Sequence, residues 1–388
     1  MTNDEFITKN KDADVRTLAL SKTPDEIDLH FCLQQIEGLQ VAEKKIPAWT
    51  KTAGILFPPK ISLEQCSSEQ TAQYKQQLVE RFLPMKRQKM VDLTGGFGID
   101  FSYLARLFDE ADYVERNEHL CDIAKHNFSL LGLSQARVHH ATCEDFLDEM
   151  GLFDIIYLDP SRRNAVGRKV VALNDCSPNV EELQDKLLAH APIVLVKLSP
   201  MLDIQDTLRR LPNIGEVHVV SVEGECKEVV LVLCREKQDV TVHCVNLPAQ
   251  TQTFSTTIQQ TEPVIATHLE HYLYEPNASI LKAGVQNSLC QKFGVKKLHP
   301  FSHLFISAHF IDDFPGRSFE IEDSCSFAKK DLKRMLADIT QCNLTVRNFP
   351  ATVAALRKRL KLREGGDIYL FATTLADESH VLIRCKKL

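Results

Sequence analysis

A glycine-rich segment near residue 95 has the residue types of a turn that binds a ligand through its backbone. The stretch Val91-Asp-Leu-Thr-Gly-Gly-Phe-Gly-Ile-Asp100 follows a short apolar run and precedes an apolar pattern with helical spacing. Gly96 and Gly98 would let the backbone approach a ligand closely, and the amides at the start of the helix would face an anionic group. Asp92, at the end of the strand, can accept a hydrogen bond from an ammonium or a hydroxyl group.

Two acidic residues farther along the chain extend this pattern. Glu115 ends the next expected strand, 23 residues after Asp92. In doubly wound folds, an acid about 20 residues beyond the glycine turn binds ribose hydroxyls. Asp145, within the segment Thr142-Cys-Glu-Asp-Phe146, is a candidate to lie beside an adenine. The spacing therefore predicts a ligand that contains a nucleoside.

A third motif places an acid where a reacting group would lie. In Phe153-Asp-Ile-Ile-Tyr-Leu-Asp-Pro-Ser-Arg-Arg163, Asp159 and Pro160 follow a buried strand, and open α/β sheets bind ligands at the carboxyl ends of their strands. The acid would reach the reacting centre, and the proline would stiffen the turn. The cations that follow, Arg162, Arg163, Arg168 and Lys169, suit contacts with phosphate.

The elements that must position these residues alternate between strand and helix. The expected strands are Met90–Leu93, Tyr113-Val114, Arg137–His140, Phe153–Leu158 and Ile193–Val196, and the expected helices are Phe101–Phe108, His119–Leu131, Glu144–Met150, Val180–Leu188 and Ile204–Leu211. Such alternation predicts a parallel sheet with helices on both faces. Two further strands, Val217–Val222 and Val229–Cys234, are too close in sequence for a helical crossover, so they must pair antiparallel. This ending is typical of a methyltransferase sheet and not of a dinucleotide-binding domain.

The flanking regions have other patterns. Residues 1 to about 80 have helical spacing, interrupted at Pro58-Pro59, with a serine-capped helix over Thr71–Phe82. After about residue 238 we expect a strand within Thr241–Phe254 and a helix over Thr261–Glu275. An α+β tail follows, with helices at Asp331–Ile339 and Thr352–Leu362 and strands at Leu344–Val346, Asp367–Ala372 and Val381–Cys385.

Composition excludes several classes of protein. The chain has 388 residues, of which 44% are hydrophobic and 25% charged, which is typical of globular proteins. No apolar run approaches the ~20 residues that span a bilayer, and the N-terminus is acidic where a signal peptide would be basic. The twelve cysteines form no Cys-x-x-Cys pair, which argues against zinc ribbons. We therefore expect a cytoplasmic protein with reduced thiols, no metal and no membrane association.

The net charge of −6 conceals a strong asymmetry. Lys282–His299 carries four lysines and no acid, and Lys329–Arg363 carries ten basic residues against two acidic ones. Together these stretches hold +12, which leaves −18 on the rest of the chain. A basic C-terminal region on an acidic body indicates a polyanionic partner, and a solvated helix face is the alternative. On the helix expected over Thr352–Leu362, Arg357 and Lys361 share one face, so both can reach a phosphate backbone.

Taken together, these motifs resemble those of a known family. Residues from about 85 to 236 resemble a class I S-adenosylmethionine-dependent methyltransferase, through Asp92-Leu-Thr-Gly-Gly-Phe-Gly98, Tyr113-Val-Glu-Arg116 and Asp159-Pro-Ser-Arg162. The whole chain is similar to a bacterial family with a THUMP-like domain at its C-terminus. The matching tail residues are Asn348-Phe-Pro350, Leu356-Arg-Lys-Arg-Leu-Lys-Leu-Arg-Glu-Gly-Gly366 and Tyr369-Leu-Phe-Ala-Thr373.

The resemblance implies a fold and a division of the chain. The fold would be a doubly wound α/β sheet of seven strands that ends in an antiparallel hairpin. The implied parts are a helical N-terminal region (1–83), the methyltransferase domain (84–238), a connecting and ferredoxin-like segment (239–317, its ferredoxin-like part from about 274) and the THUMP-like domain (318–388). Nothing in the sequence specifies an oligomeric state.

The resemblance also implies the residues of the site. The cofactor-binding residues would be Asp92, Thr94, Gly95, Gly96, Phe97, Gly98, Glu115, Arg116 and Asp145, the catalytic residues Asp159 and Pro160, and the substrate-binding residues Arg162, Arg163, Arg357 and Lys361. Two positions depart from the usual pattern. Thr94 replaces the first glycine of the loop, as in RNA-directed relatives, and Thr142 stands where an acid often contacts the adenine.

The function expected from this resemblance is methyl transfer from S-adenosylmethionine, with RNA favoured as the acceptor. Ser161-Arg162 stands where enzymes that methylate base amines carry an aromatic residue, so that reaction is not directly supported. Cys176 could serve carbon-5 methylation as a nucleophile, and Lys197 could serve ribose methylation. Two alternatives stay open: a methyltransferase of a protein or small molecule, and a non-catalytic RNA-binding protein that retains the cofactor.

Overall fold

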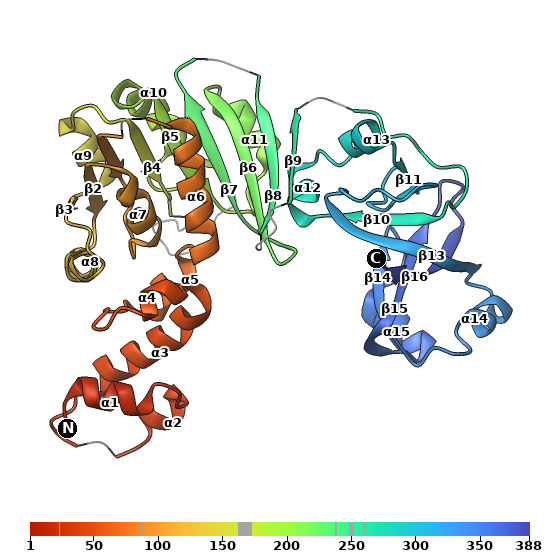
Figure 1. Ribbon diagram of the computed structural model, residues 1–388, viewed down its shortest axis with the longest axis horizontal. Helices are drawn as coiled ribbons and strands as arrows, with labels where there is room; N and C mark the ends of the chain where they lie inside the picture. The colour runs from red at the N-terminus through yellow and green to blue at the C-terminus, as the bar shows by residue number, and fades with distance from the viewer. Residues whose placement is uncertain (23, 86, 162–172, 237–238, 248–251, 259–260) are drawn as a thin grey trace. The chain divides into compact units, whose positions relative to one another are not determined.

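The structure is a computed structural model that describes residues 1–388 except 23, 86, 162–172, 237–238, 248–251 and 259–260 (Figure 1). By compactness the chain forms two units. The first unit contains Met1–Glu216 and Val229–Gln238, and the second contains Val217–Glu228 and Asp239–Leu388. The helices of the described residues fall short of the length and apolarity that a bilayer crossing requires.

Six helices precede the first strand of the first unit. They are α1 (Asn3–Asn10), α2 (Val15–Ala19), α3 (Leu29–Lys45), α4 (Pro47–Thr50), α5 (Lys60–Gln65) and α6 (Glu69–Phe82). The α6 helix begins after Ser68, whose side chain accepts a hydrogen bond from the amide of Thr71, as the sequence predicts. The buried face of α6 includes Lys75 beside Leu78 and Val79, which is an unusual place for a lysine.

The first sheet of the chain begins with five parallel strands. Its elements are β1 (Lys89–Asp92), β2 (Glu110–Glu115), β3 (Ala136–His140), β4 (Ile155–Leu158), β5 (Ile193–Leu198), β6 (Ile214–Val222) and β7 (Glu225–Cys234). Neighbouring pairs among β1 to β5 are parallel, and β7 pairs antiparallel with β5. Glu223 and Gly224 connect β6 to β7 with φ angles of 52° and 80°, the left-handed geometry of a tight hairpin turn.

The strand order is β3-β2-β1-β4-β5-β7-β6, continued by β8 (Thr241–Leu247) and β9 (Gln252–Thr257). The sheet therefore has nine strands where we expected seven. The extra pair arises because β8 and β9 pair antiparallel with each other and extend the sheet beyond strand β6. An edge strand offers unpaired backbone groups, and adding strands satisfies them.

The helices of the sheet follow their strands as the spacing predicts. They are α7 (Ile99–Leu104), η1 (Ala105–Leu107), α8 (Glu118–Leu130), α9 (Cys143–Glu149), η2 (Leu173–Asp175), α10 (Val180–His190) and α11 (Ile204–Arg210). The core beneath the glycine-rich turn contains Phe101, Tyr113 and Phe128, whose ring centroids lie 4.9–5.4 Å apart. This aromatic cluster fixes β2, α7 and α8 around the turn.

The second unit has a sheet of its own, in the order β11-β12-β10-β13-β16-β15-β14. Its strands are β10 (Tyr272–Pro276), β11 (Lys296–Lys297), β12 (Phe305–Ser307), β13 (Gly316–Ser326), β14 (Gln341–Arg347), β15 (Arg363–Thr374) and β16 (His380–Lys387). Its helices are α12 (Ala278–Ala283), α13 (Ser288–Phe293), α14 (Lys329–Met335) and α15 (Val353–Leu360).

The helix expected over Thr261–Glu275 is wrong. Residues 261–271 contain no helix, and Tyr272–Pro276 form strand β10. This strand pairs antiparallel with both β12 and β13, which buries Leu273 and Tyr274 completely. Pairing on both sides outweighs the local helical pattern because it satisfies the backbone and buries both faces of the strand at once.

Candidate functional site

The turn between β1 and α7 needs its glycines. Gly96 and Gly98 have φ angles of +58° and +83°, which side chains rarely allow. A Cβ atom on Gly95 would lie 2.2 Å from the ring of Tyr113, and one on Gly98 would lie 2.7 Å from that of Phe128. At Gly96 the nearest atom to such a Cβ is the Thr94 carbonyl oxygen, 3.8 Å away, so the space above this residue is open.

Glu115 lies at the end of β2 and contacts this turn directly. Its Oε2 accepts a hydrogen bond of 2.9 Å from the amide of Gly96, and its Oε1 accepts one of 2.8 Å from the amide of Asn117. Each carboxylate oxygen can accept a further hydrogen bond, so hydroxyl groups can bind here. The structure thus brings Glu115 to the turn. Arg116 is exposed beside it.

Asp92 is buried at the end of β1, with only 1% of its surface exposed. Its Oδ1 accepts hydrogen bonds from the amide of Thr94 at 2.9 Å and from the hydroxyl of Thr94 at 3.3 Å. Burial raises the pKa of Asp92 well above its usual range, because the charged form has lost its solvent. A cationic group bound nearby would stabilise the charged form and lower the pKa again.

Thr94 connects the turn to the second motif. Its hydroxyl donates to Asp92 and accepts a hydrogen bond of 2.6 Å from the backbone amide of Asp159. A glycine at this position, as in the usual pattern, could make neither bond. The departure from the usual pattern therefore has a structural role that the sequence alone does not reveal.

Asp159 lies at the carboxyl end of β4 and forms an ion pair with Lys197 on the neighbouring strand β5. The Nζ of Lys197 lies 2.5 Å from Oδ2 of Asp159, and Lys197 is only 8% exposed. Asp159 keeps about a third of its side chain exposed, and Pro160 is buried. The two neighbouring strands thus bring a carboxylate and an ammonium group together at the carboxyl ends of the parallel strands.

A buried charge network lies beneath this pair. Asp100, on α7, accepts hydrogen bonds of 2.6 and 2.7 Å from Ser67 and Tyr157, and its Oδ1 lies 3.1 Å from Nζ of Lys75. The Nζ of Lys197 lies 4.0 Å from Oδ2 of the same carboxylate. Burial acts to raise the pKa of Asp100, but the ammonium groups of Lys75 and Lys197 outweigh it and hold the pKa below its usual value.

The sequence motifs do not reveal this network. Its members come from the N-terminal region (Ser67, Lys75), from α7 (Asp100) and from two strands (Tyr157, Lys197). The one sequence feature that could have indicated the network is Lys75, because it lies on the apolar face of α6, where it is completely buried. A lysine at such a position requires a partner, because burying an unpaired charge is costly.

The N-terminal helices also anchor the turn through Phe97. This ring is 4% exposed, and its centroid lies 5.0 Å from that of Trp49 and 6.3 Å from that of Phe57. Phe97 therefore points into a core that the N-terminal region provides. The ring thus supports the turn from the side of the protein core.

The other residues expected at the site differ in their exposure, and some lie outside the described part of the chain. Asp145 is exposed, and its side chain accepts a hydrogen bond of 2.7 Å from Thr142, the cap of α9. Cys176 is buried. Arg162 and Arg163, with Arg168 and Lys169, lie outside the described residues.

Arg357 and Lys361 do not share a helical face. The α15 helix ends at Leu360, and Lys361 has a left-handed φ of +57°. Arg357 is largely buried; its guanidinium lies 3.5 Å from Glu364 and donates to the carbonyl of Cys342 at 3.4 Å. The expectation is wrong because the chain turns directly into β15 at Arg363. Arg357 supports the domain, and the exposed cations are its neighbours, including Lys361.

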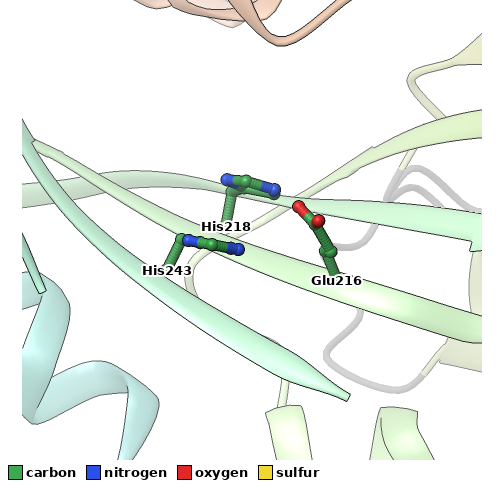
Figure 2. A group of neighbouring side chains, drawn as sticks. All are labelled: Glu216, His218 and His243. Carbon is green, nitrogen blue, oxygen red and sulfur yellow. The ribbon is translucent and has the colours of Figure 1, made fainter. Parts of the chain in front are cut away.

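Three potential metal ligands lie on β6 and β8. Glu216, His218 and His243 have ligand atoms within 4.8 Å of one another (Figure 2). The two imidazole rings are stacked, with centroids 4.5 Å apart and planes 8° apart. An imidazole binds a metal in the plane of its ring, so two stacked parallel rings do not direct lone pairs at one ion. Glu216 also forms an ion pair with Arg81. We assign no metal here.

Comparisons with known proteins agree with this architecture. A family described as a ferredoxin-like domain matches residues 272–315, and one described as THUMP domain-like matches residues 316–387. A crystal structure from Porphyromonas gingivalis W83, of a protein provisionally named a methyltransferase, is 32% identical with a TM-score of 0.87. That match covers 99% of this chain and 97% of the other. No functionally curated protein matches the sequence.

Two further solved structures match only part of the chain. An RNA methyltransferase, provisionally so named, from Pyrococcus horikoshii is 18% identical over 43% of this chain and 76% of its own, with a TM-score of 0.32. Precorrin-6y C5,15-methyltransferase from Geobacter metallireducens GS-15 is 12% identical over 42% and 89%, with a TM-score of 0.33. These two likenesses are too weak to bear on function. The near-complete match and the two tail domains show that the chain belongs to the bacterial methyltransferase family that ends in a ferredoxin-like and a THUMP-like domain.

Proposed function

We propose that this protein transfers a methyl group from S-adenosylmethionine to RNA. The observation that carries the proposal is the hydroxyl of Thr94, which bonds the carboxylate of Asp92 on one side and the amide of Asp159 on the other. The residues suited to hold a cofactor and the residue suited to meet an acceptor are thus parts of one rigid site. Direct methyl transfer mainly requires such alignment.

The residues at the turn fit this cofactor. Gly96 leaves open space for a ligand, and Glu115 beside it has free acceptor capacity for ribose hydroxyls. The buried carboxylate of Asp92 suits the ammonium group of the methionine part, which would relieve the cost of its ionisation. S-adenosylmethionine, when bound, supplies an electrophilic methyl group on its sulfonium.

Asp159 and Lys197 would act on the acceptor. The ion pair holds the carboxylate of Asp159 at the sheet edge, where it can orient an acceptor group or take its proton. Lys197 is fixed in turn by Asp100, so the pair has a defined position before any acceptor arrives. Preorganisation of this kind lowers the barrier because no charged group must be rearranged during transfer.

RNA is the acceptor we favour because of the C-terminal region. The match to a THUMP-like domain covers residues 316–387, which include the more basic of the two stretches, Lys329–Arg363. A basic surface on an otherwise acidic chain attracts polyanions. Proteins and small molecules are the alternative acceptors, and the assay below separates RNA from protein.

The test is transfer of labelled methyl groups from the cofactor into total RNA and, in parallel, into total protein. We expect label in RNA, abolished by Asp159→Asn, while calorimetry shows unchanged cofactor binding by that variant. Asp122→Asn is the matched control, because Asp122 is exposed on α8 and pairs with Lys125 at 3.5 Å. Label in protein alone would refute RNA as the acceptor, and label in neither, with no cofactor binding, would refute methyl transfer.

A further inference from the structure

A hollow of about 550 Å³ opens on the THUMP-like domain beside α14 and α15. Its floor is apolar and contains Phe327, Leu332, Leu336 and Leu360, all of them partly exposed. The volume is in the range of natural ligand pockets, roughly 300–1,000 Å³. These four side chains pack against the core of the domain on one side and leave part of their apolar surface exposed to the hollow on the other.

Three cations line the same hollow. Lys329 and Lys333 are exposed and lie four residues apart, on one side of α14. Arg359 comes from α15, and its guanidinium lies 5.8 Å from the ring centroid of Phe327. The hollow therefore combines a cationic rim with an apolar floor.

Several basic residues of the domain form ion pairs with acidic side chains. Arg334 pairs with Asp323 at 2.7 Å, and Arg384 pairs with Asp338 at 3.0 Å. Within the described part of the chain, Lys329, Lys333 and Arg359 have no acidic partner within ion-pair distance. Uncompensated positive charge thus lies at the rim of the apolar floor.

We propose that this hollow binds single-stranded RNA, with one base on the apolar floor and the adjacent phosphates on Lys329, Lys333 and Arg359. Proteins bind single strands by stacking bases on aromatic and guanidinium faces inside a cationic groove. Bases in a duplex are not free to enter a hollow, so the occupant is unpaired. This inference rests on the proposed function and names the surface by which RNA is held.

The first test measures the salt dependence of binding by the full-length protein. The probe is a fluorescent oligouridylate, titrated at several salt concentrations. Each phosphate contact on a single strand contributes about 0.7 to the log–log slope, so Lys329→Gln with Lys333→Gln should flatten it by about 1.4. The matched control is Lys386→Gln with Lys387→Gln, two exposed lysines at the end of β16, which should leave the slope unchanged.

The second test concerns the base. An abasic ribose-phosphate oligomer should bind the parent protein roughly 5- to 100-fold more weakly than oligouridylate, the loss of one stacked base. Ala337→Trp fills the hollow from an exposed position without changing charge. This variant should bind both probes with similar affinity and keep the salt slope of the parent. Calorimetric binding of S-adenosylmethionine confirms that each variant is folded.

The outcomes separate this inference from the proposed function. Suppose that the parent binds oligouridylate and transfers label into RNA, but the Lys329/Lys333 variant keeps the salt slope of the parent. The hollow is then rejected as an RNA-binding site, while the proposal of RNA methylation stands. If the parent binds no RNA, both fail together. If polyglutamate binds as tightly as oligouridylate, and Ala337→Trp affects both equally, the occupant is an acidic peptide and the inference is overturned.

Discussion

Lys75→Met should strongly destabilise the protein, because it removes the cation from a buried ion pair. Lys75 is completely buried, and its ammonium lies 3.1 Å from Oδ1 of Asp100. At an effective dielectric constant of about 20, charges at this distance attract by about 5 kcal/mol. Removing one partner of a buried pair costs about 3–5 kcal/mol. Lys197 remains near Asp100 at 4.0 Å, so we expect a loss near the lower end, about 3 kcal/mol.

The pH dependence of this loss follows from the pKa of Asp100. In the parent, Lys75 and Lys197 outweigh burial and hold that pKa below its usual value, so the stabilisation is complete at neutral pH and is lost only in acid. Without Lys75, burial would raise the pKa above that of the unfolded chain. The variant should then lose stability as pH rises through the raised pKa, so its deficit should grow from acid toward neutral pH.

Urea unfolding followed by Trp49 fluorescence measures this effect. Trp49 is the only tryptophan, is 2% exposed and lies in the same unit as Lys75. Lys60→Met is the matched control, because Lys60 pairs with Glu37 at 2.7 Å on the surface, and it should change stability little. Adding Asp100→Asn to Lys75→Met should recover part of the loss. A loss below about 1 kcal/mol, constant from about pH 5 to about pH 8, would refute the buried pair.

Three further predictions concern the cofactor site. Glu115→Ala should weaken calorimetric binding of S-adenosylmethionine by about 1.5–3 kcal/mol through lost charge-assisted hydrogen bonds, and equal affinity would remove Glu115 from the site. Because burial raises the pKa of Asp92, the affinity for a cationic ligand should increase as pH rises toward that pKa. Asp92→Asn should make the affinity independent of pH over this range. A parent protein whose affinity does not change with pH would contradict this prediction. Thr94→Val should lower the methyl-transfer rate more than it lowers cofactor affinity. Thr94→Ser keeps the hydroxyl that accepts from the amide of Asp159, so it should be close to the parent in both measurements. If the two variants have equal effects, the hydrogen bond to Asp159 is unimportant.

The sequence by itself determined the elements with a local signal. The strand ends that present Asp92, Glu115 and Asp159 were predictable because apolar runs, turns and helix caps are set by neighbouring residues. The positive φ angles of Gly96 and Gly98 likewise reflect a steric requirement that a single residue type meets. These local features suffice to place the candidate site at the carboxyl ends of the strands, because parallel strands end at one edge of their sheet.

Only the tertiary structure decided how those residues act together. The bond from the amide of Asp159 to Thr94 joins residues 65 positions apart, and Lys197 meets Asp159 from a separate strand. Lys75 reaches Asp100 from a helix that lies outside the recognised motifs. Tyr272–Pro276 form a strand in spite of a helical pattern, because they pair with two strands that are distant in sequence. Ion pairs and sheet pairing depend on which distant segments become neighbours, and burial, not local spacing, sets their free energy.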